Sequence, residues 1–261
     1  MFKIWQHFIN GNKAQCGALL LWAQTLLLPV QAATPVKVIT AEWPEFTNRD
    51  LSGSYFDYLR MVLPPEQYTF QVEFSNFGRA ISALEKQQAD LTFGLTHTDA
   101  PTALRANIPY DSDRIIAIYM PELQGLTSLK NMSLQSLNSF RLAWDLAYNY
   151  GAAMGLISEG YQVTSPEQGV NLVVSKRVDI YLAEHGDLTE PHVQALLKNP
   201  SIRQEQILQI PVFVGFANNS RGQALKKVWD ARVRELKTNG ELAQFYQSHP
   251  AMLVAESVIN P

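Results

Sequence analysis

Residues 89–114, ADLTFGLTHTDAPTALRANIPYDSDR, decide how this chain is interpreted. The apolar run at 91–95 is too short for a helix and predicts a buried strand. A polar segment follows, which opens with Thr96 and His97 and reaches Arg105. In α/β sheets small ligands bind where loops leave the carboxyl ends of strands, so this segment is a candidate binding surface. The alternative is an ordinary surface loop, because Thr and Asp also favour turns.

The chain before this strand alternates between strand and helix patterns. Residues 36–41 and 68–74 have strand patterns, and residues 56–63 and 77–88 have helical spacing of apolar side chains. Pro64 and Pro65 end the first of these helices. Two crossovers in succession predict a mainly parallel sheet covered by helices.

A second alternating series begins after a connection at residues 121–131. We predict its strands at 141–144, 161–164 and 178–183, and its helices at 150–159 and 166–176. The two series resemble each other locally, since a helix leads to an Asp before a strand at both Asp90 and Asp179. We interpret these aspartates as turn residues. The pattern predicts an α/β fold of two lobes, each with a mainly parallel sheet flanked by helices.

The last part of the chain returns to strand and then to helix. Residues 207–211 and 212–217 are two apolar strand-like runs. A long helix is predicted at 223–238, where Asn239-Gly240 ends it, and a final turn or two follows at 241–247.

The composition excludes several classes of function. The 261 residues carry a net charge of −3, or −3 − 2 = −5 without residues 1–32, which contain two lysines and no acidic residue. This mild acidity argues against a nucleic-acid partner. No metalloprotease, Walker, dinucleotide or nucleophile-elbow motif is present, and the histidine spacing indicates no metal site. We therefore expect neither a cofactor nor a metal.

Residues 1–32 have the pattern of a secretory signal peptide. Lys3 and Lys13 lie in a basic head, an apolar run follows at 17–28, and residues 30–32 offer a small-residue cleavage site. An uncleaved membrane anchor is the alternative. The single cysteine, Cys16, lies inside this segment, so the mature chain has no cysteine. We expect a periplasmic protein whose core is large enough to need no disulfide.

Several segments, in this order, resemble those of the bacterial family 3 extracellular solute-binding proteins, the polar amino-acid binders of ABC transporters. No single segment is specific, but the ordered set covers about 220 residues. The segments are Glu42-Trp43-Pro44-Glu45-Phe46, Gly53-Ser54-Tyr55-Phe56-Asp57, Phe77-Gly78-Arg79-Ala80, Asp90 to Thr96, Pro109-Tyr110, Ser133 to Leu137, Lys176-Arg177-Val178-Asp179 and Asn239-Gly240-Glu241-Leu242.

The resemblance implies two lobes of the type II periplasmic binding fold, joined by two hinge strands that close on a small ligand. Lobe 1 would comprise residues 33–118 and 213–261, and lobe 2 residues 119–212. The ligand-binding residues would include four aromatic side chains, for which core packing is the alternative. The full set is Trp43, Phe77, Thr96, His97, Arg105, Trp144, Tyr148 and Glu184.

Two positions decide how far the resemblance extends to the ligand. In amino-acid binders an Arg shortly after the Thr that follows the central strand grips the ligand carboxylate. Here the next Arg is Arg105, several residues late, so either the loop delivers it or the function is absent. The acid that meets the ligand's amino group is retained as Glu184. A cationic or polyamine-like ligand is therefore as consistent with the sequence as a plain amino acid.

Three functions follow from the resemblance. The first is a monomeric, non-enzymatic binding protein that delivers a small polar nitrogen-containing ligand to the membrane permease of an ABC transporter. The second is a ligand-binding partner of a membrane sensor. The third is a dehydratase-type enzyme, with proton transfer by Glu184, His185 and His97. Its dicarboxylate substrate would find only Arg105 as an evident clamp.

Overall fold

The computed structural model describes residues 32–121, 128–130, 132–146 and 148–259. Residues 33–261 form one compact unit, and the predicted signal peptide lies outside the described residues except for Ala32. No helix within the described ranges is long and apolar enough to cross a membrane. The division of the chain into two lobes stays a prediction.

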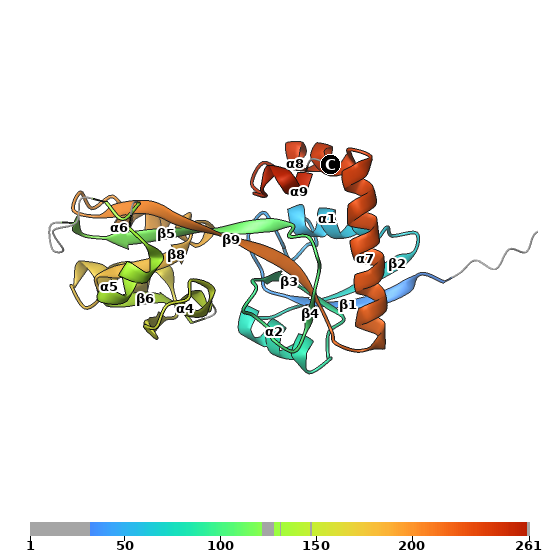
Figure 1. The fold of residues 1–261 in the computed structure, drawn as a ribbon, viewed down its shortest axis with the longest axis horizontal. Coiled ribbons are helices and arrows are strands. Elements are labelled where there is room, and N and C mark those ends of the chain that lie inside the picture. The colour runs from blue at the N-terminus through green and yellow to red at the C-terminus, as the bar shows by residue number, and fades with distance from the viewer. Residues whose placement is uncertain (1–31, 122–127, 131, 147, 260–261) are drawn as a thin grey trace, which may run out of the picture. The chain divides into compact units, whose positions relative to one another are not determined.

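The strands join in one sheet of nine strands (Figure 1). Its path runs β2-β1-β3-β9-β5-β8-β6-β7, and β4 pairs with β9 off this path. The strands are β1 (Thr34–Thr40), β2 (Tyr68–Phe74), β3 (Leu91–Leu95), β4 (Leu104–Arg105), β5 (Asp111–Tyr119), β6 (Leu142–Asp145), β7 (Tyr161–Val163), β8 (Ile180–Glu184) and β9 (Arg203–Phe216).

The predicted α/β class is confirmed, and each of the two strand series is parallel as predicted, but the sheet that they form together is mixed. Strands β2, β1 and β3, which we call the first strand set, are parallel to one another, and so are β8, β6 and β7, the second strand set. Both β5 and β9 run antiparallel to their neighbours, so the sheet is mixed. The helical crossovers correctly predicted parallel pairs, but they contain no information on how the two sets join.

The helices cover these strands and start where the sequence provides caps. Asn76, Ser165 and Asn219 each accept a backbone N–H of the first turn, at the starts of α2, α5 and α7. The helices are α1 (Ser54–Val62), α2 (Phe77–Glu85), α4 (Tyr150–Ala153), α5 (Pro166–Val174), α6 (Pro191–Leu197), α7 (Ser220–Thr238), α8 (Glu241–Ser248) and α9 (Glu256–Ile259), with 3-10 turns η1 (Leu134–Ser139) and η2 (Gly186–Leu188).

Two of the sequence-based elements need correction, and two further elements were missed. The runs 207–211 and 212–217 belong to one strand, β9, which passes through Pro211 opposite Ser112. The helix expected at 150–159 is only α4, which ends at Ala153. Helix α6 and the short β4 were not predicted.

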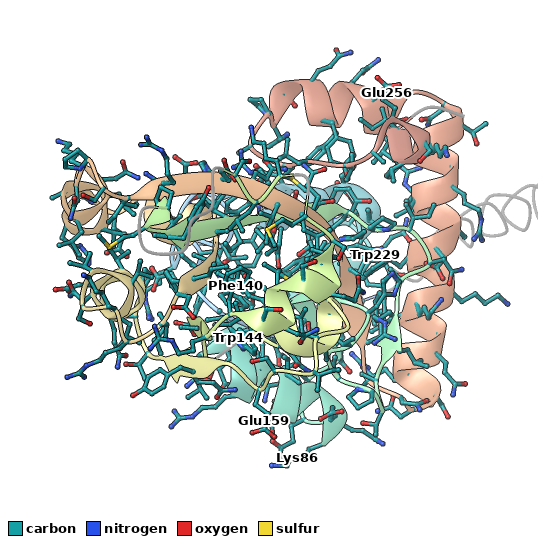
Figure 2. The ribbon with its side chains drawn as sticks, turned by 60° about the vertical axis from the view of Figure 1, so that its left-hand side comes forward. Lys86, Phe140, Trp144, Glu159, Trp229 and Glu256 are labelled. Carbon is teal, nitrogen blue, oxygen red and sulfur yellow. The ribbon has the colours of Figure 1, made fainter. Side chains whose placement is uncertain are left out.

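Hydrophobic side chains form separate buried clusters around the two strand sets. The first combines β1, β3, α1 and α7, and it includes Trp229 of α7, which Figure 2 labels on that helix. Val214 and Phe216 of β9 also belong to it. Two further clusters surround the second strand set, and they are drawn almost entirely from residues between 115 and 210.

Asp90 and Asp179 have the same structural role in the two strand sets. The carboxylate of Asp90 accepts the backbone N–H of Lys37 at 2.8 Å, and its own N–H donates to the Lys37 carbonyl. Asp179 makes the same pair of contacts with Arg141, at 2.7 Å for the carboxylate. Each aspartate therefore ties the start of β3 or β8 to its parallel neighbour, which is more than the turn role that we predicted.

Candidate functional site

Three of the predicted aromatic residues lie together although they come from different parts of the chain. Trp43 follows β1, Phe77 begins α2 and Tyr148 follows β6. The ring centroids of Trp43 and Phe77 are 5.5 Å apart with the planes at 62°, and those of Phe77 and Tyr148 are 6.3 Å apart. Trp43 and Tyr148 are half-buried, and Phe77 is buried. We call Trp43, Phe77 and Tyr148 the aromatic trio.

Gly94 makes room for the aromatic trio on strand β3. It has a φ of +83°, a left-handed conformation that favours glycine. A Cβ atom at this position would lie 2.9 Å from the Trp43 ring and 3.3 Å from the Phe77 ring. The glycine in the sequence LTFGL therefore lets the two rings pack directly over the strand.

Tyr148 connects the aromatic trio to a second tyrosine and to a carboxylate. Tyr148 stacks on Tyr150 with centroids 5.1 Å apart and planes at 9°. Its hydroxyl donates a long hydrogen bond of 3.5 Å to Asp187 in turn η2. Tyr150 is buried, and its hydroxyl has no hydrogen-bond partner among the described residues.

Five carboxylates gather around the start of β5, and we call them the acidic cluster: Asp99, Asp111, Asp113, Glu184 and Asp187. Strand geometry explains the arrangement. Alternation along β5 puts Asp111 and Asp113 on one face. Glu184 ends β8 opposite Ile115, after which η2 turns back and carries Asp187. No Lys, Arg or His within the described ranges forms an ion pair with any of these five groups.

Burial and mutual repulsion raise the pKa of three of these carboxyls, Asp111, Asp113 and Asp187. The pKa of Asp187 is raised to about 7, first by burial and then by the neighbouring Glu184, although the hydrogen bond from Tyr148 lowers it in part. The pKa of Asp113 is raised well above its usual range by burial, followed by the charges of Glu184 and Asp111. Burial raises the pKa of Asp111 to about 6. Ionised carboxylates in such a place attract a compensating cation.

Thr96 and Arg105 organise the loop after β3. The carboxylate of Asp99 accepts the backbone N–H of Thr96 at 2.8 Å and its hydroxyl at 2.7 Å. Arg105 lies in β4, and its guanidinium donates to the backbone carbonyl of Asp99 at 2.9 Å. Arg105 is half-buried and has no ion pair with a carboxylate among the described residues. Its late position in the sequence is thus accommodated by this short strand.

The remaining predicted residues lie in different surroundings. His97 is exposed, and its ring lies 4.6 Å from that of Phe213 in β9. Trp144, labelled in Figure 2, is only 3% exposed and packs against Gly151 and Gly160 inside the second strand set's core. Trp144 is therefore a core residue, in a cluster against which Tyr148 packs, and no ring contact joins it to the aromatic trio among the described residues. Glu184 is half-buried and accepts backbone N–H groups of Arg114 and Gly186.

Asp113, Asp187 and Tyr150 were missed from the sequence as site residues. Asp113 could have been predicted, because the sequence Asp111-Ser112-Asp113 has an acid at every second residue at the start of a strand. Asp187 depends on the turn after β8, and no local pattern predicts its position.

Other parts of the surface offer weaker candidates. Open hollows of about 580 and 510 Å³ lie beside Tyr161 of β7 and beside Lys37 of β1, and neither is lined by the aromatic trio or the acidic cluster. Among the described residues, no group of three or more His, Cys, Asp or Glu side chains has an arrangement that could hold a metal ion.

No protein-family model matches the sequence, and no curated protein matches it significantly. The structure, by contrast, matches solved structures of binding proteins. A substrate-binding protein of an ABC uptake transporter from Streptococcus pneumoniae, with bound histidine, is 14% identical with a TM-score of 0.57, over 82% of this chain and 91% of that one. A histidine kinase sensor domain similar to periplasmic binding proteins is 11% identical with a TM-score of 0.63, over 85% and 99%.

A third match is an ancestral amino-acid-binding protein that is a precursor of cyclohexadienyl dehydratase. It is 15% identical with a TM-score of 0.54, over 82% of this chain and 94% of that one. The fold of this chain therefore matches that of the bacterial amino-acid and solute-binding proteins of ABC transporters, at low sequence identity. The resemblance inferred from the sequence is confirmed at the level of the fold.

Proposed function

We propose that the protein is a periplasmic binding protein for a small polar solute with a positively charged nitrogen. The observation that carries this proposal is the contact between the aromatic trio and the acidic cluster through Tyr148 and Asp187. Aromatic faces attract cations through their quadrupole, and desolvated carboxylates do so by charge. An amino acid or a polyamine-like molecule has such a nitrogen.

The proposed binding residues divide by chemistry. Trp43, Phe77 and Tyr148 provide rings against the apolar part and the cation, and Glu184 accepts its N–H groups. Thr96 and Arg105 would meet a carboxylate where the ligand has one, because Arg105 has no carboxylate partner in the part of the chain that the structure describes. Closure of two lobes on the ligand follows when each lobe makes contacts that exist only in the liganded state.

Delivery of the ligand to an ABC permease is the first function that we propose, and the fold match to substrate-binding proteins supports it. A role as partner of a membrane sensor is the second. It is supported by the match to a kinase sensor domain, almost all of which aligns with this chain. Genes for a permease and an ATPase beside this gene would favour transport, and a gene for a membrane sensor would favour signalling.

A dehydratase is less compatible with the site. A dicarboxylate substrate would face the acidic cluster, and Coulomb repulsion disfavours its binding there. Turnover of prephenate by the purified protein, with loss in Glu184→Gln, would overturn the non-enzymatic proposal.

Isothermal titration of the purified protein with a panel of amino acids and amines tests the proposed function. We expect at least one cationic compound to bind, and Trp43→Ala to weaken it tenfold or more. Tyr161→Ala is the matched control, because this exposed aromatic residue lies on the edge strand β7. Binding of none of the panel, or equal losses in the two variants, would count against the proposal.

A further inference from the structure

We propose that the site selects a solute with two cationic nitrogens over one with a single cationic nitrogen, and that Asp113 determines this selectivity by holding the second nitrogen. The inference rests on the proposed function and specifies its ligand class. Three observations support it: the acidic cluster, the hydroxyl of Tyr150 without a partner among the described residues, and the position of Asp113 on β5.

The acidic cluster can accept more than one cation when its carboxyls ionise on ligand binding. The five carboxylates of the acidic cluster come from β5, from the loop after β3 and from the end of β8 with η2. Asp99 and Asp111 are satisfied by hydrogen bonds from Thr96, Tyr55 and backbone N–H groups. Glu184 also accepts two backbone N–H groups, whereas Asp187 accepts one long hydrogen bond and Asp113 accepts none among the described residues. One ammonium group would leave part of their charge unpaired in a partly desolvated place.

Asp113 is the member with the fewest contacts. Its carboxylate has no hydrogen bond or ion pair within the described ranges, whereas Glu184 accepts two backbone N–H groups and Asp187 accepts the Tyr148 hydroxyl. After burial, the charges of Glu184, Asp111, Asp187 and Asp99 raise the pKa of Asp113. A group so placed is free to accept N–H donors from a ligand.

Tyr150 provides an independent sign that a polar ligand group belongs here. Its side chain is 1% exposed, and its hydroxyl has no partner among the described residues. Its ring stacks on that of Tyr148, whose hydroxyl donates to Asp187, so Tyr150 lies one ring away from the acidic cluster. Burial and then Tyr148 raise the pKa of Tyr150, followed by the charges of Asp113, Asp187 and Glu184. A ligand N–H can donate to this oxygen, which removes the cost of an unsatisfied buried hydroxyl.

The cationic side chains near the site do not provide the missing charge. Arg105 is bound to the Asp99 carbonyl, and it is the group that would hold a ligand carboxylate. Arg114 follows Asp113 directly, so strand alternation puts its side chain on the opposite face of β5. A second ligand nitrogen thus compensates Asp113 better than any described residue does.

Three ligands of matched length separate the possibilities. Titration calorimetry with 1,4-diaminobutane, butylamine and 4-aminobutyrate compares two cations, one cation, and one cation with a carboxylate on the same four-carbon scale. Diamines of three and five carbons test other distances between the two nitrogens. We expect the best diamine to bind at least thirtyfold more tightly than butylamine, and 4-aminobutyrate to bind more weakly than the diamine.

The variant Asp113→Asn keeps the shape of the side chain and removes its charge. We expect it to lower diamine affinity at least tenfold and to lower butylamine affinity much less. Glu167→Gln makes the same charge change on exposed α5 and should leave both affinities unchanged. The melting temperature of each variant establishes that it is folded.

The outcomes distinguish the two proposals. Equal affinities for diamine and monoamine, or equal losses of both in Asp113→Asn, would overturn the dication inference and leave the proposed function standing. Binding of an amino acid with a single cationic nitrogen in preference to every diamine would do the same. Failure of every cationic compound to bind would overturn both.

Discussion

Strands β1 and β3 of the first strand set and β6 and β8 of the second are joined at their starts by equivalent aspartates, Asp90 and Asp179. Their other ends differ. The first set leads to Trp43, Phe77 and a threonine loop whose one carboxylate is already satisfied. The second leads to Tyr148, to Glu184 with its two backbone N–H donors, and to Asp187 with one long hydrogen bond. Similarly built strand sets thus end mainly in aromatic side chains in the first set and in carboxylates in the second. The aspartates at the strand starts stabilise the fold, and the residues at the strand ends are those proposed to bind the ligand.

The largest difference in stability between the two strand sets should come from the glycines that pack against tryptophans, Gly160 and Gly94. Gly160 has a φ of +57°, and a Cβ there would lie 2.1 Å from the buried Trp144 ring. Gly160→Ala should therefore lower the free energy of unfolding by about 3 kcal/mol through overpacking and strain. Gly94→Ala should cost less, about 1–2 kcal/mol, because the half-buried Trp43 can move, but it should weaken ligand binding. Urea denaturation and calorimetry measure these effects, and the reverse order would contradict the comparison.

The paired aspartates offer a test of structural equivalence. Asp90→Ala and Asp179→Ala each remove a carboxylate that accepts a backbone N–H at the start of a strand. We expect similar losses of about 1–2 kcal/mol in the free energy of unfolding. Binding of the best ligand should change little in either variant. If only one of the two loses stability, the two strand sets are not built alike.

The pH dependence of stability should distinguish Asp187, at the end of the second strand set, from the aspartates at the strand starts. Because the pKa of Asp187 is raised to about 7, the folded state keeps this proton while the unfolded chain loses it at lower pH. Stability is therefore lost as the pH rises towards and through 7. Asp187→Asn should be more stable than the unmodified protein at pH 8, by about 1 kcal/mol, and equal to it near pH 4. Urea titrations at the two pH values measure this, and a difference independent of pH would contradict it.

The arginines that pair with the two aspartates should have the smallest effects. Arg141 and Arg221 are exposed, and their ion pairs with Asp179 and Asp90 are both 2.7 Å long. Exposed pairs contribute little, so Arg141→Ala and Arg221→Ala should each cost less than about 1 kcal/mol at moderate salt. A larger loss, measured by thermal unfolding, would show that the guanidinium rather than the carboxylate holds the strand starts together.

Local patterns predicted most strands and helices, because the alternation of apolar side chains is strong in residues 34–95. They failed where the answer depended on distant parts of the chain. Pro211 suggested a break, but β9 continues through it beside β5. Trp144 matched a cleft aromatic residue in sequence, yet the small residues Gly151 and Gly160 create a buried space for it. The position of Asp187 depends on a turn whose partner, Tyr148, lies 39 residues away.

The path of β9 also determines the order in which the chain can fold during synthesis. The first hydrophobic cluster needs Val214, Phe216, Trp229 and Met252 as well as Val36. The clusters around the second strand set are almost complete by residue 210. The first strand set can therefore complete its core only after the C-terminal residues have been synthesised. The second strand set, in the middle of the chain, can form its core earlier. A chain that stops near residue 200 leaves β1 and β3 without their cover and is exposed to aggregation or proteolysis.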